Sequence, residues 1–121
     1  MQYHCLVYFD PQVVFSGSPD AEAILAEVGP HTAELQASGS LVMFQPLNLP
    51  REAVTVRMRD GKMSTTDGPF METKEMLGGL VLIEARDLNE AVRIAAAMPH
   101  ARLGAVEVRP VIDFSKPRPK L

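Results

Sequence analysis

The sequence predicts an α+β fold in which helices cover one face of an antiparallel sheet, the ferredoxin-like or split βαβ arrangement. Strand patterns over residues 2–9, 80–85 and 105–112 are separated by helical patterns over 18–38 and 87–98. A further hairpin pattern lies between the first helix and the later strands. With that hairpin set aside, the order of elements is β-α-β-β-α-β, which is typical of this fold class.

The chain is expected to form a single domain over residues 1–114, followed by a mobile tail over residues 115–121. A chain of 121 residues, of which 46% are apolar, has the usual size and composition of one globular domain. The tail is rich in proline and in basic residues, and chain ends of this kind are often poorly ordered.

The strand predictions rest on residue type, on period-two alternation and on turn residues. Residues 2–9 are rich in β-branched and aromatic side chains, and residues 41–49 form a second apolar run. Residues 53–59 alternate between apolar and polar side chains. Asp60-Gly61 then gives the two-residue turn of a hairpin, whose second strand covers residues 62–66.

The first helical pattern begins near Ser18 or Asp20, either of which can cap a helix, and ends at Gly39. Gly29-Pro30 interrupts the pattern, either as a kink or as a break between two helices.

Two further helices are predicted in the second half of the chain. Residues 70–77 could form two helical turns that end at Gly78-Gly79. A longer helix over residues 87–98 begins at a capping box, in which Asp87 is the N-cap and Glu90 follows three residues later.

Charge and composition exclude several classes of function. The net charge is −3, whereas binding to a phosphate backbone calls for a basic surface, so we expect no nucleic-acid partner. The single cysteine, Cys5, permits no internal disulfide, and we interpret it as a buried structural residue. No signal peptide or membrane span is visible, which predicts a cytoplasmic protein with no membrane contact.

Nothing in the sequence predicts a cofactor or a metal. The chain has no phosphate-binding loop and no dinucleotide fingerprint. Its three histidines lack the spacing of metal ligands on a helix.

The strands at residues 3–9 and 80–85 are apolar on both faces, which predicts a homodimer. An antiparallel sheet with one face in water shows polar alternation instead. Two helices can cover only one face of the sheet, which leaves an apolar face exposed to water. Pairing with the sheet of a second copy is the simplest way to bury that face.

The segment Asp67-Gly68-Pro69-Phe70-Met71-Glu72-Thr73-Lys74-Glu75 combines acidic, basic and hydroxyl groups in one loop. Together with Leu77-Gly78-Gly79, Thr55-Val56-Arg57 and Glu107-Val108-Arg109-Pro110-Val111, it resembles the signature of the YCII-related family, in its DGPF branch. The resemblance covers roughly residues 3–112. It implies a dimeric α/β-barrel fold and a link with extracytoplasmic-function sigma factors, and it supplies no established reaction.

Three residues are candidates for acid–base catalysis. Asp67 and Glu72 could act as a general base if a neighbouring acid or an apolar wall raised the pKa. Asp67 could instead be a turn or capping residue. His31 follows Pro30 and is a third candidate if it points into a cleft near the helix interruption.

Three basic residues are candidates for holding an anionic ligand. Arg57 could grip a carboxylate at two points if its strand face lines a cleft, and it belongs to a charged outer face otherwise. Arg109 allows the same two interpretations. Lys74 either holds an anion or pairs with Glu72 or Glu75 on the surface.

Two functions follow from these candidates. The first is a cofactor-independent enzyme or binding protein that takes a small acidic or apolar molecule in a cleft beside the DGPF loop. The second is a non-enzymatic regulatory or interaction module linked to a sigma-factor pathway. An enzyme should show a concave, mostly apolar pocket with convergent polar groups, whereas a docking module can show a flat patch.

Overall fold

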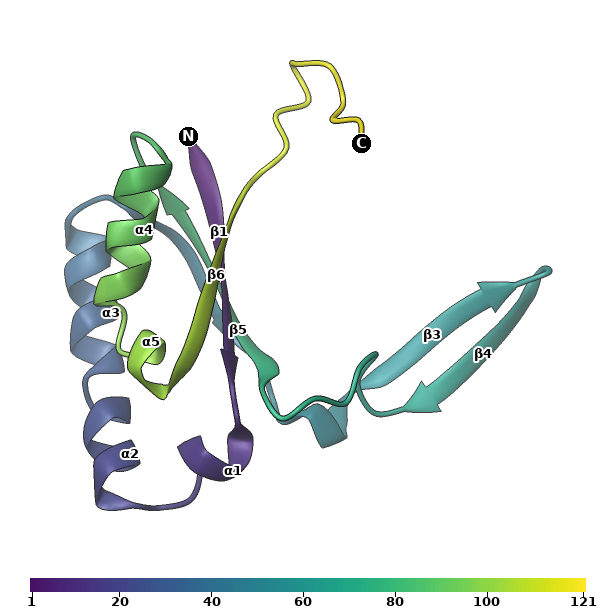
Figure 1. Ribbon diagram of the computed structural model, residues 1–121, viewed down its shortest axis with the longest axis horizontal. Helices are drawn as coiled ribbons and strands as arrows, with labels where there is room; N and C mark the ends of the chain where they lie inside the picture. The colour runs from purple at the N-terminus through teal and green to yellow at the C-terminus, as the bar shows by residue number, and fades with distance from the viewer.

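The computed structural model describes residues 1–121 and confirms an α+β fold with an antiparallel sheet (Figure 1). Four strands form the sheet in the order β2-β5-β1-β6, and every neighbouring pair is antiparallel. Their bounds are β1 Gln2–Phe9, β2 Leu41–Pro46, β5 Met76–Glu84 and β6 Gly104–Pro110. The two remaining strands, β3 Val54–Arg59 and β4 Lys62–Asp67, form a separate hairpin. Without this hairpin the order is the predicted β-α-β-β-α-β.

The helices lie on one face of the sheet, as predicted (Figure 1). They are α2 Pro19–Leu25, α3 Val28–Ala37, α4 Leu88–Ala97 and α5 His100–Leu103. Two short pieces, α1 Pro11–Val14 and the 3-10 turn η1 Pro50–Glu52, lie in the connections that follow β1 and β2. No helix is long and apolar enough to cross a membrane.

The hydrophobic core lies between the sheet and α4. Alternate residues of β1, Tyr3, Cys5 and Val7, point into it, and Ala91 and Ala95 approach from α4. Cys5 is fully buried, as predicted, and burial raises the pKa of its thiol to about 11. The thiol is therefore protonated at neutral pH, and only a thiolate is a good nucleophile or metal ligand.

The other face of the sheet, which we call the open face, carries no helix. Leu6 and Tyr8 of β1 and Leu80 and Leu82 of β5 point to this side, because they alternate with the core residues along each strand. All four are only half-buried. The structure thus confirms that the two central strands are apolar on both faces.

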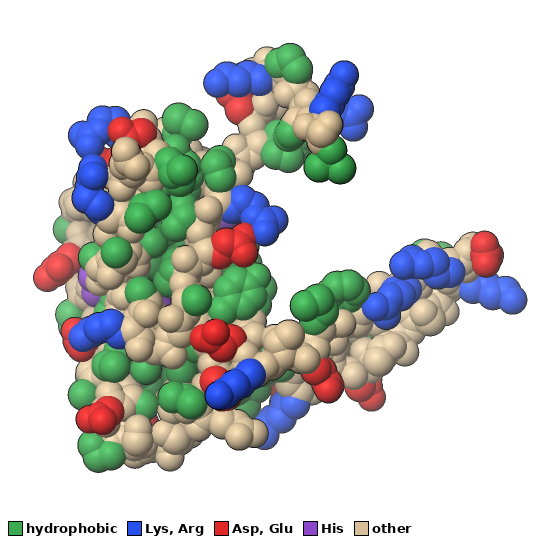
Figure 2. Space-filling model, viewed as in Figure 1, with side chains coloured by type: hydrophobic (Ala, Val, Ile, Leu, Met, Phe, Trp, Pro, Cys, Tyr) green, Lys and Arg blue, Asp and Glu red, His purple; other side chains and the backbone are tan.

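The β3–β4 hairpin turns at Asp60-Gly61, as predicted. Asp60 has φ 51° and Gly61 has φ 74°, the two successive positive values that a type I′ turn requires. The hairpin projects away from the sheet on the side opposite the helices (Figure 1). Figure 2 shows hydrophobic side chains near the hairpin base, next to the open space between hairpin and sheet.

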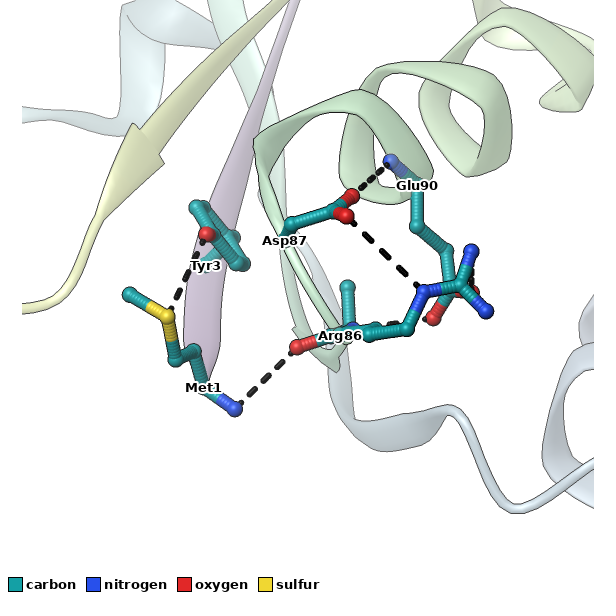
Figure 3. Close-up of polar contacts among 6 residues, drawn as sticks. Met1, Tyr3, Arg86, Asp87 and Glu90 are labelled. Atoms are coloured by element: carbon teal, nitrogen blue, oxygen red, sulfur yellow. Dashed lines mark hydrogen bonds and ion pairs between the residues drawn. The ribbon is translucent and has the colours of Figure 1, made fainter.

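Asp87 is the N-cap of α4, as predicted, whereas Glu90 reaches back to Arg86, the residue before the cap, instead of to Asp87 (Figure 3). Asp87 Oδ1 accepts a hydrogen bond of 2.9 Å from the backbone N–H of Glu90, and Glu90 Oε1 accepts one of 2.9 Å from the backbone N–H of Arg86. Nearby, the amino group of Met1 donates to the backbone oxygen of Ala85 at 3.1 Å. The bond from Met1 fastens the start of β1 to the end of β5, next to the start of α4.

The first helical segment breaks earlier than the sequence indicated. The interruption lies at Ala26-Glu27, between α2 and α3, whereas Gly29-Pro30 lies inside the first turn of α3. A proline is tolerated there because the first backbone N–H groups of a helix have no intrahelical partner in any case.

The prediction of helical turns over residues 70–77 is wrong. No helix forms there, and β5 begins at Met76 instead of residue 80. The Thr73 hydroxyl donates to the backbone oxygen of Glu75 at 2.5 Å, a local bond that competes with helical pairing. Gly78 and Gly79 lie within β5, where the pairing with β1 shifts register between Val7 and Tyr8.

His100 lies at the start of α5, with its ring 5.8 Å from that of Phe44 in an edge-on arrangement. Its Nδ1 atom is buried and has no hydrogen-bond partner. Burial, and then the nearby His31, lower the pKa of His100 below its usual value. The folded chain therefore holds His100 neutral at a pH where the unfolded chain protonates it.

Substitution of Gly104 by alanine should destabilise the protein by about 1–3 kcal/mol, the usual cost of overpacking. A Cβ atom at Gly104 would lie 2.0 Å from the backbone oxygen of Tyr8 and 2.9 Å from the Cα atom of Phe9. Urea unfolding followed by circular dichroism measures the loss. Gly79→Ala is the matched control, since its added methyl group meets nothing closer than 3.7 Å. Equal losses for the two variants would contradict the packing described here.

The free energy of unfolding should fall as the pH is lowered below about 6.5, the ordinary pKa of an unfolded histidine. The pKa of His100 is lowered in the folded state, so the unfolded chain binds the proton first. Its contribution to stability is present above pH 6.5 and is lost on acidification. Urea unfolding of the wild type and of His100→Phe at pH 7.5 and 5.5 measures the effect. An unchanged pH dependence in the variant would count against it.

Candidate functional site

A large pocket lies where the base of the hairpin meets the sheet. Its volume is about 550 Å³, within the usual range for small-molecule sites. Tyr8 of β1 and Leu77 of β5 form the wall that belongs to the open face. The pocket is also lined by residues 47–50, which follow β2, and by residues 69–71, which follow β4.

The pocket is mostly apolar, and a few polar groups border it. Tyr8 contributes a hydroxyl, and Glu52 and Glu75 contribute carboxylates. The Thr73 hydroxyl also borders the pocket but already donates to the Glu75 backbone oxygen. An apolar wall that excludes water strengthens each hydrogen bond and charge interaction with a bound molecule.

A second hollow, of about 410 Å³, adjoins the first and has several charged residues in its lining. It brings together the two acids that the sequence singled out, Asp67 and Glu72, and adds Arg51. The two hollows share four wall residues: Pro50, Pro69, Thr73 and Met76. The predicted acids therefore lie beside the apolar pocket, across the wall that the Pro69–Thr73 loop forms.

The turn that positions this loop depends on glycine. Gly68 has φ 106°, which disfavours any side chain. Its backbone N–H donates to the Ala53 oxygen at 2.7 Å, and its own oxygen accepts a bond of 2.9 Å from the Thr55 hydroxyl. These bonds fix the start of the loop to the hairpin base, so that Asp67 ends β4 and Glu72 lies nearby.

Arg57 lies close to the pocket without lining it. Its guanidinium carbon is 5.4 Å from the centre of the Phe70 ring, and Phe70 is a pocket wall. A cation over an aromatic face is held by about 0.5–1 kcal/mol at an exposed site. Lys74, the neighbouring candidate, is exposed and lines neither hollow.

Two sequence candidates lie away from the pocket. Arg109 is on β6, on the open face opposite His4, and forms an ion pair with Glu107. His31 is on α3 and lines a different hollow, with Glu27, Glu34 and residues of the α4–α5 connection. The sheet separates His31 from Tyr8, because the helices and Tyr8 are on opposite faces.

Sequence reasoning missed Tyr8, Glu75 and the segment Leu47–Pro50. The signal for Tyr8 was present, since it is the polar-tipped residue on the second apolar face of the first strand. Leu47–Pro50 gave no signal of its own, because it joins the site through a long-range contact: the Leu47 backbone N–H donates to the Gly78 oxygen at 2.9 Å.

No group of three histidine, cysteine, aspartate or glutamate side chains is placed to hold a metal ion.

The fold is shared with an enzyme of known structure. That enzyme is the 5-chloro-2-hydroxyhydroquinone dehydrochlorinase of Burkholderia phenoliruptrix AC1100, solved in complex with 2,5-dihydroxybenzoquinone. The TM-score is 0.51 at 15% identity, and the match covers 93% of this chain and 94% of the other. At this identity the likeness concerns the fold.

Sequence comparison identifies the family. An uncharacterized protein of Rhizobium meliloti (strain 1021) is 32% identical over 114 residues, which are 92% of each chain. The model of the YCII-related domain matches residues 1–115. The chain therefore belongs to the YCII-related family.

Proposed function

We propose that this protein binds a small, mostly apolar molecule in the pocket beside the Asp67–Phe70 turn and acts on it without a cofactor. The observation that carries the proposal is the pocket itself, concave, about 550 Å³ in volume and mainly apolar in its walls. The Asp67-Gly68-Pro69-Phe70 motif at its edge also supports assignment to the DGPF branch of the family.

Proton transfer is the chemistry that these side chains support. Glu75 borders the pocket, so its carboxylate can take a proton from the ligand or return one, whereas Asp67 and Glu72 lie in the adjoining hollow behind the Pro69–Thr73 loop. Tyr8 is a lining residue of the pocket, and in this proposal its O–H group donates a hydrogen bond to a ligand oxygen. The Burkholderia dehydrochlorinase acts on a small substituted ring, which supports this size class of ligand, although a shared fold does not fix a reaction.

The alternative, a docking module whose loop is a flat contact surface, receives less support. Residues 69–71 of that loop form one wall of a pocket instead of a flat patch.

We also infer that two copies pair through the open face. A compact monomer of this mass, 13.2 kDa, exposes about 6,400 Å². This chain exposes 8586 Å², about 2,200 Å² more. Two such chains carry an excess of about 4,400 Å², which is within the range of roughly 2,000–5,000 Å² that obligate homodimers bury.

A thermal-shift screen tests the pocket. Small aromatic and aliphatic compounds, with and without a carboxylate, are offered at several pH values. A ligand at 100 times its dissociation constant should add about 2.7 kcal/mol of stability, a shift of several degrees in melting temperature. The shift should disappear in Ala53→Trp, because an indole at that pocket wall occupies the ligand's space.

Ala23→Trp is the matched control, since Ala23 is exposed on α2 and should keep the full shift. Glu75→Gln separates binding from chemistry: it should keep the shift and remove turnover, because Glu75 is a carboxylate that borders the pocket. A ligand shift that survives Ala53→Trp would place binding elsewhere, and a library without any hit would contradict the proposal.

A further inference from the structure

The β3–β4 hairpin, residues 54–67, is here called the arm. Its two strands contact each other and make only marginal contact with any other helix or strand of the chain. An isolated two-stranded hairpin is marginally stable in water and normally requires a further strand or a packed face. Within its own chain, the arm pairs with no further strand and packs no face against another element.

One face of the arm is an apolar stripe. Val54, Val56 and Met58 on β3 are each 58% exposed, and Met63, which pairs with Met58 across the turn, is 68% exposed. The opposite face carries Thr55, Arg57 and Arg59, which pair with Thr66, Ser64 and Lys62. Along β3 this alternation is the pattern of a strand with one face buried and one face in water, whereas on β4 Thr65 and Asp67 lie on the side of the stripe together with Met63. No other part of the chain covers the stripe.

We propose that the apolar stripe of the arm docks on a second copy of this chain, so that each protomer's arm contacts its partner. The inference rests on the homodimer proposed above and adds that the arm forms part of the dimer interface. A two-fold axis makes the contact reciprocal, because the arm of each protomer meets the same surface on the other.

Three observations favour a second copy as the occupant. The arm and the open face are both apolar and uncovered, and the arm projects from the side of the molecule that the open face occupies (Figure 1). Figure 2 shows hydrophobic side chains next to the open space near the base of the arm, with Lys and Arg side chains farther out along it. The excess exposed area, to which the arm, the open face and the extended tail after β6 all contribute, is within the range that an obligate homodimer buries.

Arm docking also completes the pocket. Ala53 precedes the arm, and Pro69, Phe70 and Met71 follow it, and all four are pocket walls. Arg57 on the arm holds the Phe70 ring through a cation–π contact at 5.4 Å. Because Tyr8 forms the wall on the open face, a second copy that covers this face and fixes the arm also closes the pocket. The site of each protomer is then complete only in the pair.

Sedimentation equilibrium of the purified protein tests the proposal. The wild type should sediment as a species of twice 13.2 kDa at micromolar concentration. Val56→Asp places a carboxylate in the stripe and should raise the dimer dissociation constant at least 100-fold, because an unpaired charge is costly to bury. Ser64→Asp is the matched control. It lies on the neighbouring rung and the opposite face of the same hairpin, and it should change the constant less than threefold.

Hydrogen exchange supplies a readout that needs no substitution. Arm amides should exchange slowly at high protein concentration and approach the unprotected rate on dilution, since a free hairpin is marginal. A monomeric wild type, fast arm exchange at every concentration, or equal effects of Val56→Asp and Ser64→Asp would each overturn the proposal. A Leu6→Asp variant that dissociates while Val56→Asp stays dimeric would restrict the interface to the open face and overturn the role of the arm. Val56 does not line the pocket, so a failed ligand screen leaves these outcomes unaffected.

Discussion

The pairing of β1 on both of its edges, with β5 on one side and β6 on the other, is the constraint on which the rest of the structure depends. Since β1 is central, its alternate residues are fixed to opposite faces. Tyr3, Cys5 and Val7 meet the helices, and Leu6 and Tyr8 meet the open side. One strand therefore sets both the core and the surface at which a ligand and a second copy are proposed to bind.

The register shift at Gly78 connects this constraint with the site. A Cβ atom at Gly78 would lie 2.3 Å from the Phe9 ring, so the aromatic side chain occupies the space that the glycine leaves. The bulge places Leu77 opposite Tyr8, and both line the pocket. At the same point the Leu47 backbone N–H donates to the Gly78 oxygen. This bond holds the segment after β2 next to β5, where it lines the pocket. The register shift at Gly78 therefore accounts both for the irregularity of the sheet and for two walls of the pocket.

The sequence predicts the fold well where the determining contacts are local. The Asp60-Gly61 turn, the Asp87 N-cap and the strand over residues 2–9 each depend on neighbours in the chain, and each is confirmed. The prediction of helical turns over residues 70–77 is wrong because the Thr73 bond to Glu75 and the pairing of Met76 with Phe9 outweigh a weak helical pattern. In the candidate site, too, local contacts could be predicted from the sequence and long-range contacts could not. Asp67 and Glu72 meet because one loop carries both, whereas distances between separate elements, such as His31 from Tyr8, follow only from the tertiary structure.

The solitary thiol of Cys5 gives the molecule a built-in reporter. Cys5 pairs with Val81 of β5 on one edge and with Val108 of β6 on the other, at the middle of both ladders, and it is 0% exposed. An alkylating reagent reaches it only when the central strand separates from its neighbours. Since the chain has no other cysteine, the labelling rate of the unmodified protein measures how often the sheet opens, without any engineered probe.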